Sequence, residues 1–288
     1  MRIAHWNFDE HAGNEPVNEI YDAIKSRVGF FDYIAALASK SIVRAKNNPD
    51  LDLCFPTQYT TGSQEFPIGI AYIDLVQPFR PKHVETEVPN NSYYGNTVNL
   101  VTGPNSGVKT YFWHQTIIPA RIAAGLGDIV NASEFRYDPK GRIVIPYIPD
   151  EVDKSKGGFD ATARAFIEGL RTNPIYKGDL IIQDEAGGTT SESVEAHMVS
   201  TRLRELAAKG IGTFYITHNR QLIDEFSGSS HPQIGVINCP LETIRGELQP
   251  THRFTSGPPN WKNYFAYAVN IVDKRTASSG GIITLEKR

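Results

Sequence analysis

The sequence predicts an α/β fold, a mainly parallel sheet flanked by helices, and three consecutive segments carry this prediction. The first, Asp179–Glu185, is a short apolar run that ends in two adjacent carboxylates. The second, Glu192–Lys209, has the pattern of a long helix closed by Gly210. The third, Gly212–His218, is another apolar run that ends in histidine. A strand, a helix and a strand in this order are typical of parallel sheets, in which ligands bind beyond the carboxyl ends of the strands.

The composition and charge of the chain limit the classes of protein to which it can belong. Its 288 residues, 40% of them hydrophobic, suffice for one large domain with or without an appendage. The net charge of −3 gives no overall basic footprint for nucleic acid and leaves room only for a local basic patch. Cys54 and Cys239 are too few for a disulfide scaffold, so we predict buried thiols in a reducing compartment.

Two further features predict a cytoplasmic protein that does not enter a membrane. We find no apolar run of the roughly 18 residues that a membrane span needs. The first residues, MRIAHWNFDEH, lack the apolar region of a signal peptide.

The first part of the chain is expected to be helical. Apolar residues recur at helical spacing over residues 17–46, where Gly29 separates two helices or marks a bend. The segment Asn47–Asp50 is a stop and a turn. We therefore divide the chain into a helical segment, residues 1–64, and a main domain, residues 65–288.

The main domain is expected to begin with short strands and to continue with alternating helices and strands. Strand-like runs occur at Ile68–Ile73 and Asn96–Val101, between turns rich in Pro and Asn. A helix is expected after Lys109 through about Gly125, and Phe159–Leu170 is again helix-like. Between these helices, Asp138–Gly141 has the composition of a hairpin-type turn between two strand-like runs.

A phosphate-binding loop is predicted directly after the strand that ends near Val101. Residues 102–110 read TGPNSGVKT, close to the pattern G-x-x-x-x-G-K-[ST]. In that pattern the lysine, here Lys109, reaches the β/γ-phosphates and the hydroxyl, here Thr110, holds Mg²⁺. The pattern requires glycine at position 108, and a β-branched residue such as Val108 costs about 1–3 kcal/mol if it is forced to positive φ. The residues predicted to contact the nucleotide are Gly103, Pro104, Asn105, Ser106, Gly107, Val108, Lys109 and Thr110.

Three polar residues beyond the loop fit the chemistry of nucleotide hydrolysis. Asp184 ends an apolar strand, where an aspartate of a phosphate-loop protein organises Mg²⁺. Glu185 follows it directly and can orient or deprotonate the attacking water as a general base. His218, at the end of the next strand, can sense or stabilise the γ-phosphate. The alternatives are that Asp184 and Glu185 form an exposed strand end, and that His218 caps a helix that begins near Asn219.

These motifs resemble those of the MutS family of mismatch-repair ATPases. TGPNSGVKT resembles the family's TGPNMGGKST, and DEAGGTTSE, from Asp184 to Glu192, resembles its DEIGRGTS. ITHN at 216–219 is similar to ATHY, and VPNN at 88–91 is similar to FVPND. DEVDKSKGGF at 150–159 resembles DDLAKGRSTF, the segment that faces the partner's nucleotide in family dimers.

The resemblance covers roughly residues 65–270, and residues 17–64 resemble more weakly the helical levers that precede the family's ATPase domain. It implies a P-loop fold of the ABC type that binds ATP and Mg²⁺ and works as a homodimer or with a MutS-like partner, reaching DNA indirectly or through that partner. The implied roles are phosphate lysine for Lys109, metal ligation for Thr110 and Asp184, water activation for Glu185 and nucleotide switch for His218. His252 falls where some members place a histidine against adenine, and a surface histidine is the alternative.

Four positions of the predicted site depart from the family pattern. Val108 replaces the loop glycine, and Glu87 stands where the family has the phenylalanine that stacks on adenine. Gly188 replaces the arginine of DEIGRG, and Gly157-Gly158 replaces the Ser-Thr of the signature segment. Together these changes indicate weakened or abandoned hydrolysis, whereas the retained polar residues argue for a working site.

Three functions stay open at this point. The first is a MutS-like ATPase, slow because of Val108, that acts as a dimer in mismatch repair or related DNA transactions. The second is a pseudo-ATPase that serves as a dimerisation or scaffold module, so whether the chain is an enzyme is undecided. The third is a DNA-contacting module independent of ATP, against which the mild acidity argues. The apolar stretch Tyr264–Ile271 is expected either to form an interface helix or to pack in the core.

Overall fold

The computed structural model describes nine parts of the chain. The described residues are 53–59, 69–76, 88–91, 97–104, 109, 112–145, 175–184, 192–228 and 231–278. The helices expected within 17–46 and 159–170 lie outside these ranges. Of the segment 1–64 that we expect to be helical, the described part is 53–59, and it contains a short strand, β1 (Thr57–Gln58).

The centre of the structure is a six-stranded sheet with the strand order β11-β8-β3-β7-β6-β5. Its strands are β3 (Val98–Thr102), β5 (Ile143–Val144), β6 (Leu180–Asp184), β7 (Gly212–Ile216), β8 (Ile234–Asn238) and β11 (Thr255–Ser256). Neighbouring strands are parallel except for β11, which is antiparallel to β8. The strands expected within Asn96–Val101, Asp179–Glu185 and Gly212–His218 are therefore confirmed.

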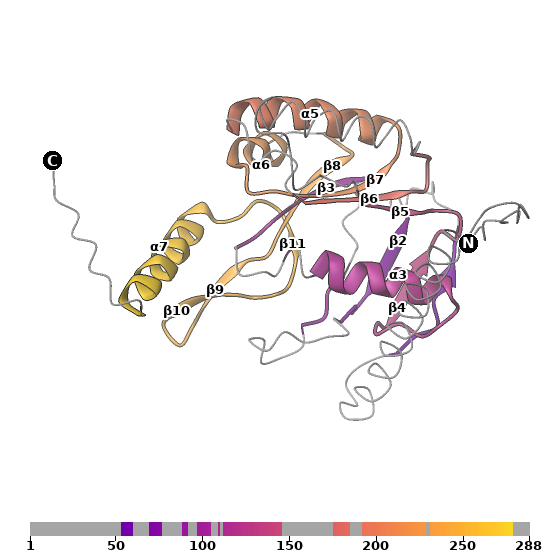
Figure 1. The fold of residues 1–288 in the computed structure, drawn as a ribbon, viewed down its shortest axis with the longest axis horizontal. Helices are drawn as coiled ribbons and strands as arrows, with labels where there is room; N and C mark the ends of the chain where they lie inside the picture. The colour runs from indigo at the N-terminus through magenta and orange to yellow at the C-terminus, as the bar shows by residue number, and fades with distance from the viewer. Residues whose placement is uncertain are drawn as a thin grey trace, which may run out of the picture.

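Helices cover both faces of this sheet (Figure 1). On one face lie α5 (Glu192–Ala208) and α6 (Arg220–Ser227), and on the other lie the π-helical segment η1 (Trp113–Ile117) and α3 (Ile118–Gly125). Because side chains alternate along a strand, Ile181 and Tyr215 pack with α5 and α6, whereas Ile182 and Ile216 pack with η1 and α3. Burial on both faces explains why these strands are mostly apolar and show no strict alternation of apolar and polar residues.

The helix between the two central strands ends as its sequence predicts. α5 stops at Ala208, and Gly210 follows with a φ of 65°, a backbone conformation that glycine adopts without a steric penalty. The N–H of Gly210 donates to the carbonyl of Ala207, and the N–H of Ile211 donates to that of Leu206. This is the Schellman arrangement, and the predicted cap at Gly210 is confirmed.

The helix expected after Lys109 through about Gly125 is confirmed over residues 112–125 and has an unusual first half. Over Trp113–Ile117 the backbone is wound as a π-helix, and α3 then continues to Gly125. Pro119, in the first turn of α3, has no N–H to donate, and the wider turns lie directly before it. Trp113 is fully buried there and stacks on Phe214 of β7 with ring centroids 4.0 Å apart. The helix is thus fixed against the centre of the sheet.

A second, three-stranded sheet has the order β1-β4-β2, with β2 (Ile70–Ile73) and β4 (Glu134–Tyr137) antiparallel. The strand expected within Ile68–Ile73 is therefore confirmed. The hairpin interpretation of Asp138–Gly141 is wrong, because the strands on its two sides belong to different sheets. β4 pairs with β1 and β2, while β5 pairs with β6. The turn itself is present, closed by a 3.2 Å hydrogen bond from Gly141 N to Asp138 O, and it carries the chain from one sheet to the other.

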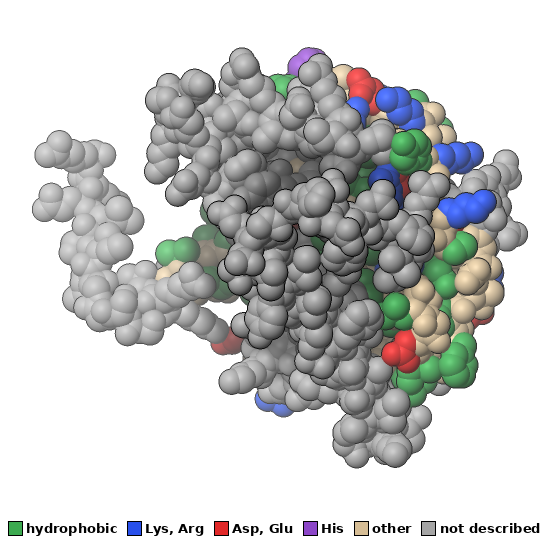
Figure 2. All heavy atoms as spheres, turned by 45° about the vertical axis from the view of Figure 1, so that its right-hand side comes forward, with side chains coloured by type: hydrophobic (Ala, Val, Ile, Leu, Met, Phe, Trp, Pro, Cys, Tyr) green, Lys and Arg blue, Asp and Glu red, His purple; other side chains and the backbone are tan. Residues whose placement is uncertain are grey.

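The arginines on α5 and α6 are paired with acidic residues. Arg204 contacts Glu225 at 2.8 Å, Arg202 contacts Glu205 at 2.7 Å, and Arg220 contacts Asp224 at 3.2 Å. On the face in Figure 2, the described Lys and Arg side chains are spread among hydrophobic and acidic ones.

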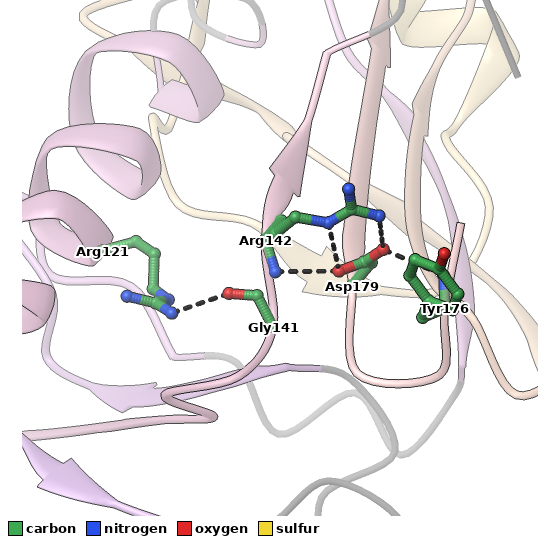
Figure 3. Close-up of polar contacts among 5 residues, drawn as sticks. All are labelled: Arg121, Gly141, Arg142, Tyr176 and Asp179. Carbon is green, nitrogen blue, oxygen red and sulfur yellow. Dashed lines mark hydrogen bonds and ion pairs between the residues drawn. The ribbon is translucent and has the colours of Figure 1, made fainter. Parts of the chain in front are cut away.

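At the amino edge of the six-stranded sheet, a buried carboxylate joins β5 to the turn before β6 (Figure 3). The carboxylate of Asp179 accepts from Arg142 Nη2 at 2.6 Å, from Arg142 N at 2.9 Å and from Tyr176 N at 2.9 Å. Close by, the carbonyl of Gly178 lies so near to Gly141 that a Cβ on Gly141 would be 2.1 Å from its oxygen. Arg121 of α3 donates to the carbonyl of Gly141 at 2.8 Å and connects this corner to the helix layer.

The last described helix, α7 (Trp261–Ser278), extends away from the sheet beside the hairpin of β9 (Leu241–Ile244) and β10 (Glu247–Pro250) (Figure 1). Phe265, Val269 and Val272 on this helix are 74%, 42% and 61% exposed. Of the two alternatives for Tyr264–Ile271, core packing is therefore wrong for Phe265 and Val269. No helix in the described part of the chain combines the length and the apolar character that a membrane crossing requires.

Candidate functional site

The candidate site lies at the carboxyl edge of the six-stranded sheet, where the central strands end at the same level. Val101 of β3 pairs with Ile216 of β7, and Ile216 pairs on its other side with Asp184 of β6. The predicted loop therefore begins beside the end of β7, and Asp184 lies one strand further along the edge. Because neighbouring strands are about 4.8 Å apart, the ends of β3 and β6 are separated by about 10 Å.

Side-chain alternation places Asp184 on the face of the sheet that packs against η1 and α3. Val101, Ile182 and Ile216 all belong to the core beneath η1 and α3. Asp184, two positions after Ile182 in β6, follows the same alternation toward that face. This is the face from which the helix following the loop approaches, so the sheet edge and the helix start meet.

Lys109 is held inside the loop by backbone oxygens. Its ammonium donates to the carbonyl of Gly103 at 2.8 Å and to that of Pro104 at 3.2 Å. The residue is 5% exposed, which is rare for lysine and costly unless the charge has partners. The loop thus concentrates positive charge at the point where the sequence predicts phosphate.

Little free space surrounds Gly103, so a larger residue there would require its neighbours to shift. A Cβ at this position would lie 3.1 Å from the Cβ of Cys239 and 3.2 Å from the Cγ of Lys109. Cys239 follows β8, whose Asn238 pairs with Thr102 of β3. The cysteine is buried and free, as expected, and burial raises its pKa to about 11, so it is a neutral packing group at physiological pH. Cys54 is likewise not in a disulfide, and it is only partly buried.

His218 lies close enough to Lys109 for the two groups to interact electrostatically. Burial, and secondarily the positive charge of Lys109, lower the pKa of His218 from 6.5 to about 4. The imidazole is therefore neutral at pH 7 and can accept a hydrogen bond as well as donate one. A triphosphate between His218 and Lys109 would oppose the effect of Lys109 on this pKa through its negative charge, and it would reinforce the effect of burial by excluding water.

The segment that carries His252 reaches the same edge through Cys239. The Cys239 thiol contacts the Thr251 hydroxyl at 3.9 Å, and the backbone of His252 lies against the same thiol. Asn90, 1% exposed, donates to the carbonyl of His252 at 3.2 Å and accepts from the N–H of Phe254 at 2.8 Å. His252 is therefore placed by its backbone beside the predicted loop. Its contact with adenine stays a prediction.

Several predicted site residues lie outside the described ranges. They are Asn105, Ser106, Gly107, Val108, Thr110 and Glu185, together with the departures Glu87, Gly157-Gly158 and Gly188. Within the described ranges, Gly103, Lys109 and His218 are brought together, and Asp184 lies on the same edge. In the part of the chain that is described, no three His, Cys, Asp or Glu side chains are placed to hold a metal by themselves.

The residue that sequence reasoning missed is Asn219. Its Oδ1 accepts a hydrogen bond from Leu222 N at 3.1 Å and caps α6, so the cap is Asn219 and the alternative role of His218 as a helix cap is wrong. An asparagine directly before a helical apolar pattern is a known start signal, and it could have identified the cap. Its second contact, to Glu192 in another helix, has no local signal.

Comparison with known proteins shows a partial similarity. Over 149 residues, 50% of its length, the chain is 30% identical to "DNA mismatch repair protein Msh6" of Gallus gallus. The match spans 11% of the length of that protein. No protein-family model matches the chain. The similarity agrees in kind with the resemblance of the motifs, and the roles of the individual residues stay predictions.

Proposed function

We propose that this chain is a MutS-like nucleotide-binding module that binds Mg²⁺–ATP at the carboxyl edge of its central sheet and hydrolyses it slowly. The observation that carries the proposal is the position of Lys109, buried at the start of a helix beside Gly103 and His218. A buried ammonium at the junction of strand, glycine loop and helix is the arrangement by which phosphate-loop proteins hold a triphosphate. The order of strands supports it, since β7 and its His218 lie between the loop strand and the Asp184 strand.

The described residues fit the phosphate group of such a ligand. The absence of a side chain at Gly103 keeps the loop backbone against Cys239 and Lys109, where any Cβ would intrude. The charge of Lys109 is compensated by carbonyl dipoles, which phosphate oxygens can replace with stronger charge-assisted bonds. Asp184 and Thr110 would hold Mg²⁺ together with phosphate oxygens and water, a set that magnesium accepts without an all-protein cage.

In this proposal the remaining residues act on water and on the γ-phosphate. Glu185, directly after Asp184, serves as the general base for the attacking water. His218, neutral at pH 7, donates one hydrogen bond to the γ-phosphate and thereby reports its presence to α6, which begins two residues later. The similarity to a mismatch repair protein supports a role in mismatch repair or related DNA transactions, with a second subunit completing each nucleotide site.

A second candidate function is a pseudo-ATPase that keeps the fold as a dimerisation or scaffold module. Val108 favours it, because a β-branched side chain replaces the glycine of the loop pattern. The hydrogen bonds from Lys109 to the carbonyls of Gly103 and Pro104 also favour the pseudo-ATPase. They give the buried ammonium acceptors within the protein, so the lysine does not depend on a bound nucleotide.

Calorimetry of Mg²⁺–ATP binding combined with a phosphate-release assay separates the two functions. We expect the unmodified chain to bind Mg²⁺–ATP and to hydrolyse it, and Glu185→Gln to bind it without hydrolysis. Val108→Gly is then expected to tighten binding by roughly one to two decades, the equivalent of about 1–3 kcal/mol. If the unmodified chain shows no binding at millimolar ATP and Val108→Gly creates it, the pseudo-ATPase is the correct function.

A further inference from the structure

We propose that Asn219 is a positioning residue that fixes His218 relative to the start of α5, and this inference rests on the nucleotide function proposed above. Asn219 directly follows His218 and is 6% exposed. Its Oδ1 accepts from the N–H of Leu222 at 3.1 Å, in the first turn of α6. Its Nδ2 donates to the carbonyl of Glu192 at 2.8 Å, across 27 residues of chain. One side chain therefore joins the two helices on this face of the sheet.

The backbone on both sides of His218 is fixed as well. Thr217, 1% exposed, donates its N–H to the carbonyl of Val101 in the strand that enters the predicted loop, at 2.9 Å. The N–H of Asn219 donates to the Thr217 hydroxyl at 3.0 Å. The N–H of Arg220 donates to the Glu192 carboxylate at 2.8 Å and repeats the connection to α5. His218 is thus held between the loop strand and α5.

The connection to Glu192 matters because of where Glu192 lies in the chain. It is the first residue of α5, and the segment between Asp184 and Glu192 carries Glu185, the proposed base. Asn219 therefore sets the distance between His218, which contacts the γ-phosphate in the proposed function, and Glu192, where the segment that carries Glu185 ends. Because catalysis depends on near-ångström placement of such groups, a loose connection lowers turnover before it lowers binding.

The choice of side chain supports this role beyond that of a helix cap. Serine or aspartate would satisfy the N–H of Leu222 as well as asparagine does. An amide carries its acceptor and its donor on two different atoms, so Asn219 bonds to α6 and to the Glu192 carbonyl at the same time. The carboxylate of aspartate has no donor, and serine has a single hydroxyl on a shorter side chain. The two functions of Asn219 can therefore be separated with substitutions that keep the cap and lose the bond to Glu192.

The test compares Asn219→Ser and Asn219→Asp with a matched cap on another helix. Asn260 precedes α7 and accepts from Asn263 N at 3.3 Å, so Asn260→Ser changes a similar cap far along the chain from His218. We expect both substitutions at Asn219 to lower kcat for ATP by roughly ten- to hundredfold. The calorimetric Kd for Mg²⁺–ATP should change far less than kcat, because Lys109 and the residues around it that grip most of the triphosphate are untouched. Asn260→Ser should leave both quantities unchanged.

A second readout needs no nucleotide and so separates this inference from the proposed function. The NMR resonance of the His218 imidazole, assigned with His218→Gln, should move in both Asn219 variants and not in Asn260→Ser. An unchanged resonance in Asn219→Ser overturns the inference, whether or not the unmodified chain binds ATP. A parallel loss of kcat, affinity and thermal stability in Asn219→Ser also overturns it, because that pattern belongs to a merely structural cap. If the unmodified chain binds no ATP but the resonance moves, the proposed function fails and the positioning of His218 by Asn219 stands.

Discussion

The ammonium of Lys109 donates to the backbone carbonyl of Gly103 at 2.8 Å, within the loop that the sequence predicts to bind phosphate. The carbonyl offers a dipole where a phosphate oxygen would offer a full charge, so the bond is the weaker of the two. The carbonyls therefore hold the ammonium of Lys109 in place, but they stabilise its charge less than an anion would.

Replacing this lysine should remove nucleotide binding while the fold survives. Lys109→Met keeps the aliphatic stem in its buried place and deletes only the charge and its donors. We expect the calorimetric affinity for Mg²⁺–ATP to fall by at least about tenfold, corresponding to about 1.4 kcal/mol, and hydrolysis to vanish. Lys140→Met, at an exposed turn position, is the matched control. Unchanged affinity in Lys109→Met would show that the ligand does not enter this loop.

The contact between Gly141 and Gly178 predicts a large effect from a single methyl group. In Gly141→Ala the new Cβ would lie 2.1 Å from the Gly178 carbonyl oxygen, and both partners are backbone, so one chain segment must move. We expect the free energy of unfolding, measured in urea, to fall by roughly 1–3 kcal/mol or more. Gly228→Ala is the control, since its Cβ would lie 3.7 Å from its nearest neighbour at a φ of −91°. Equal stability of the two variants would contradict the close approach.

The buried carboxylate of Asp179 should stabilise the fold in a pH-dependent way. Burial acts to raise its pKa, but hydrogen bonds from Arg142 and from backbone N–H groups outweigh it and hold the pKa below 3.8. Its contribution is therefore fully present above pH 3.8 and is lost as the pH falls through the lowered pKa. At pH 7 we expect Asp179→Asn to cost about 2 kcal/mol in urea unfolding.

An exposed ion pair supplies the comparison for Asp179. Arg136 and Glu134 are 2.9 Å apart with side chains 38% and 44% exposed. Glu134→Gln should cost less than about 1 kcal/mol, because water screens the pair. A cost for Asp179→Asn no greater than that for Glu134→Gln, or one that persists unchanged at pH 3, would show that the Arg142 contact contributes little.

The lowered pKa of His218 predicts that the protein loses stability in mild acid. The unfolded histidine binds a proton near pH 6.5, whereas the folded one does so only near pH 4. Between these values the unfolded state holds the extra proton, so stability falls as the pH decreases through this window. His218→Gln should remove this contribution, and its unfolding midpoint should depend less on pH between 6.5 and 4.5 than that of the unmodified chain. The other histidines contribute equally to both proteins, and equal pH slopes would therefore contradict the burial of His218 beside Lys109.

Sequence reasoning predicted the candidate site residue by residue but not its packing. The positions of Lys109, Asp184 and His218 at strand and helix ends follow from patterns only a few residues long. The contact of Gly103 with Cys239 and the bond of Asn219 to Glu192 join segments far apart in the chain. Such contacts depend on which strands become neighbours, and no local pattern records this.

The turn at Asp138–Gly141 is a second place where the sequence predicts the local conformation but not the strand pairing. Its residues were sufficient to predict a turn, since aspartate, proline and glycine restrict the backbone locally. They could not tell that the flanking strands pair elsewhere, because the partners of β4 and β5 come from other parts of the chain. The exposed Phe265 and Val269 on α7 are a further case, since helical periodicity predicts a helix but not what covers its apolar face.

By itself, the sequence determined the local elements: the strand ending at Asp184, the helix closed by Gly210 and the turn at Asp138–Gly141. Periodicity, capping and backbone restriction act over one or two turns, so these features are encoded where they occur. The tertiary structure alone decided that Cys239 lies against Gly103, that His218 lies beside Lys109 and that Asn219 reaches α5. Those relationships depend on the burial of the strands between the two helix layers. The free energy of this burial comes from the whole sheet, so no single segment encodes it.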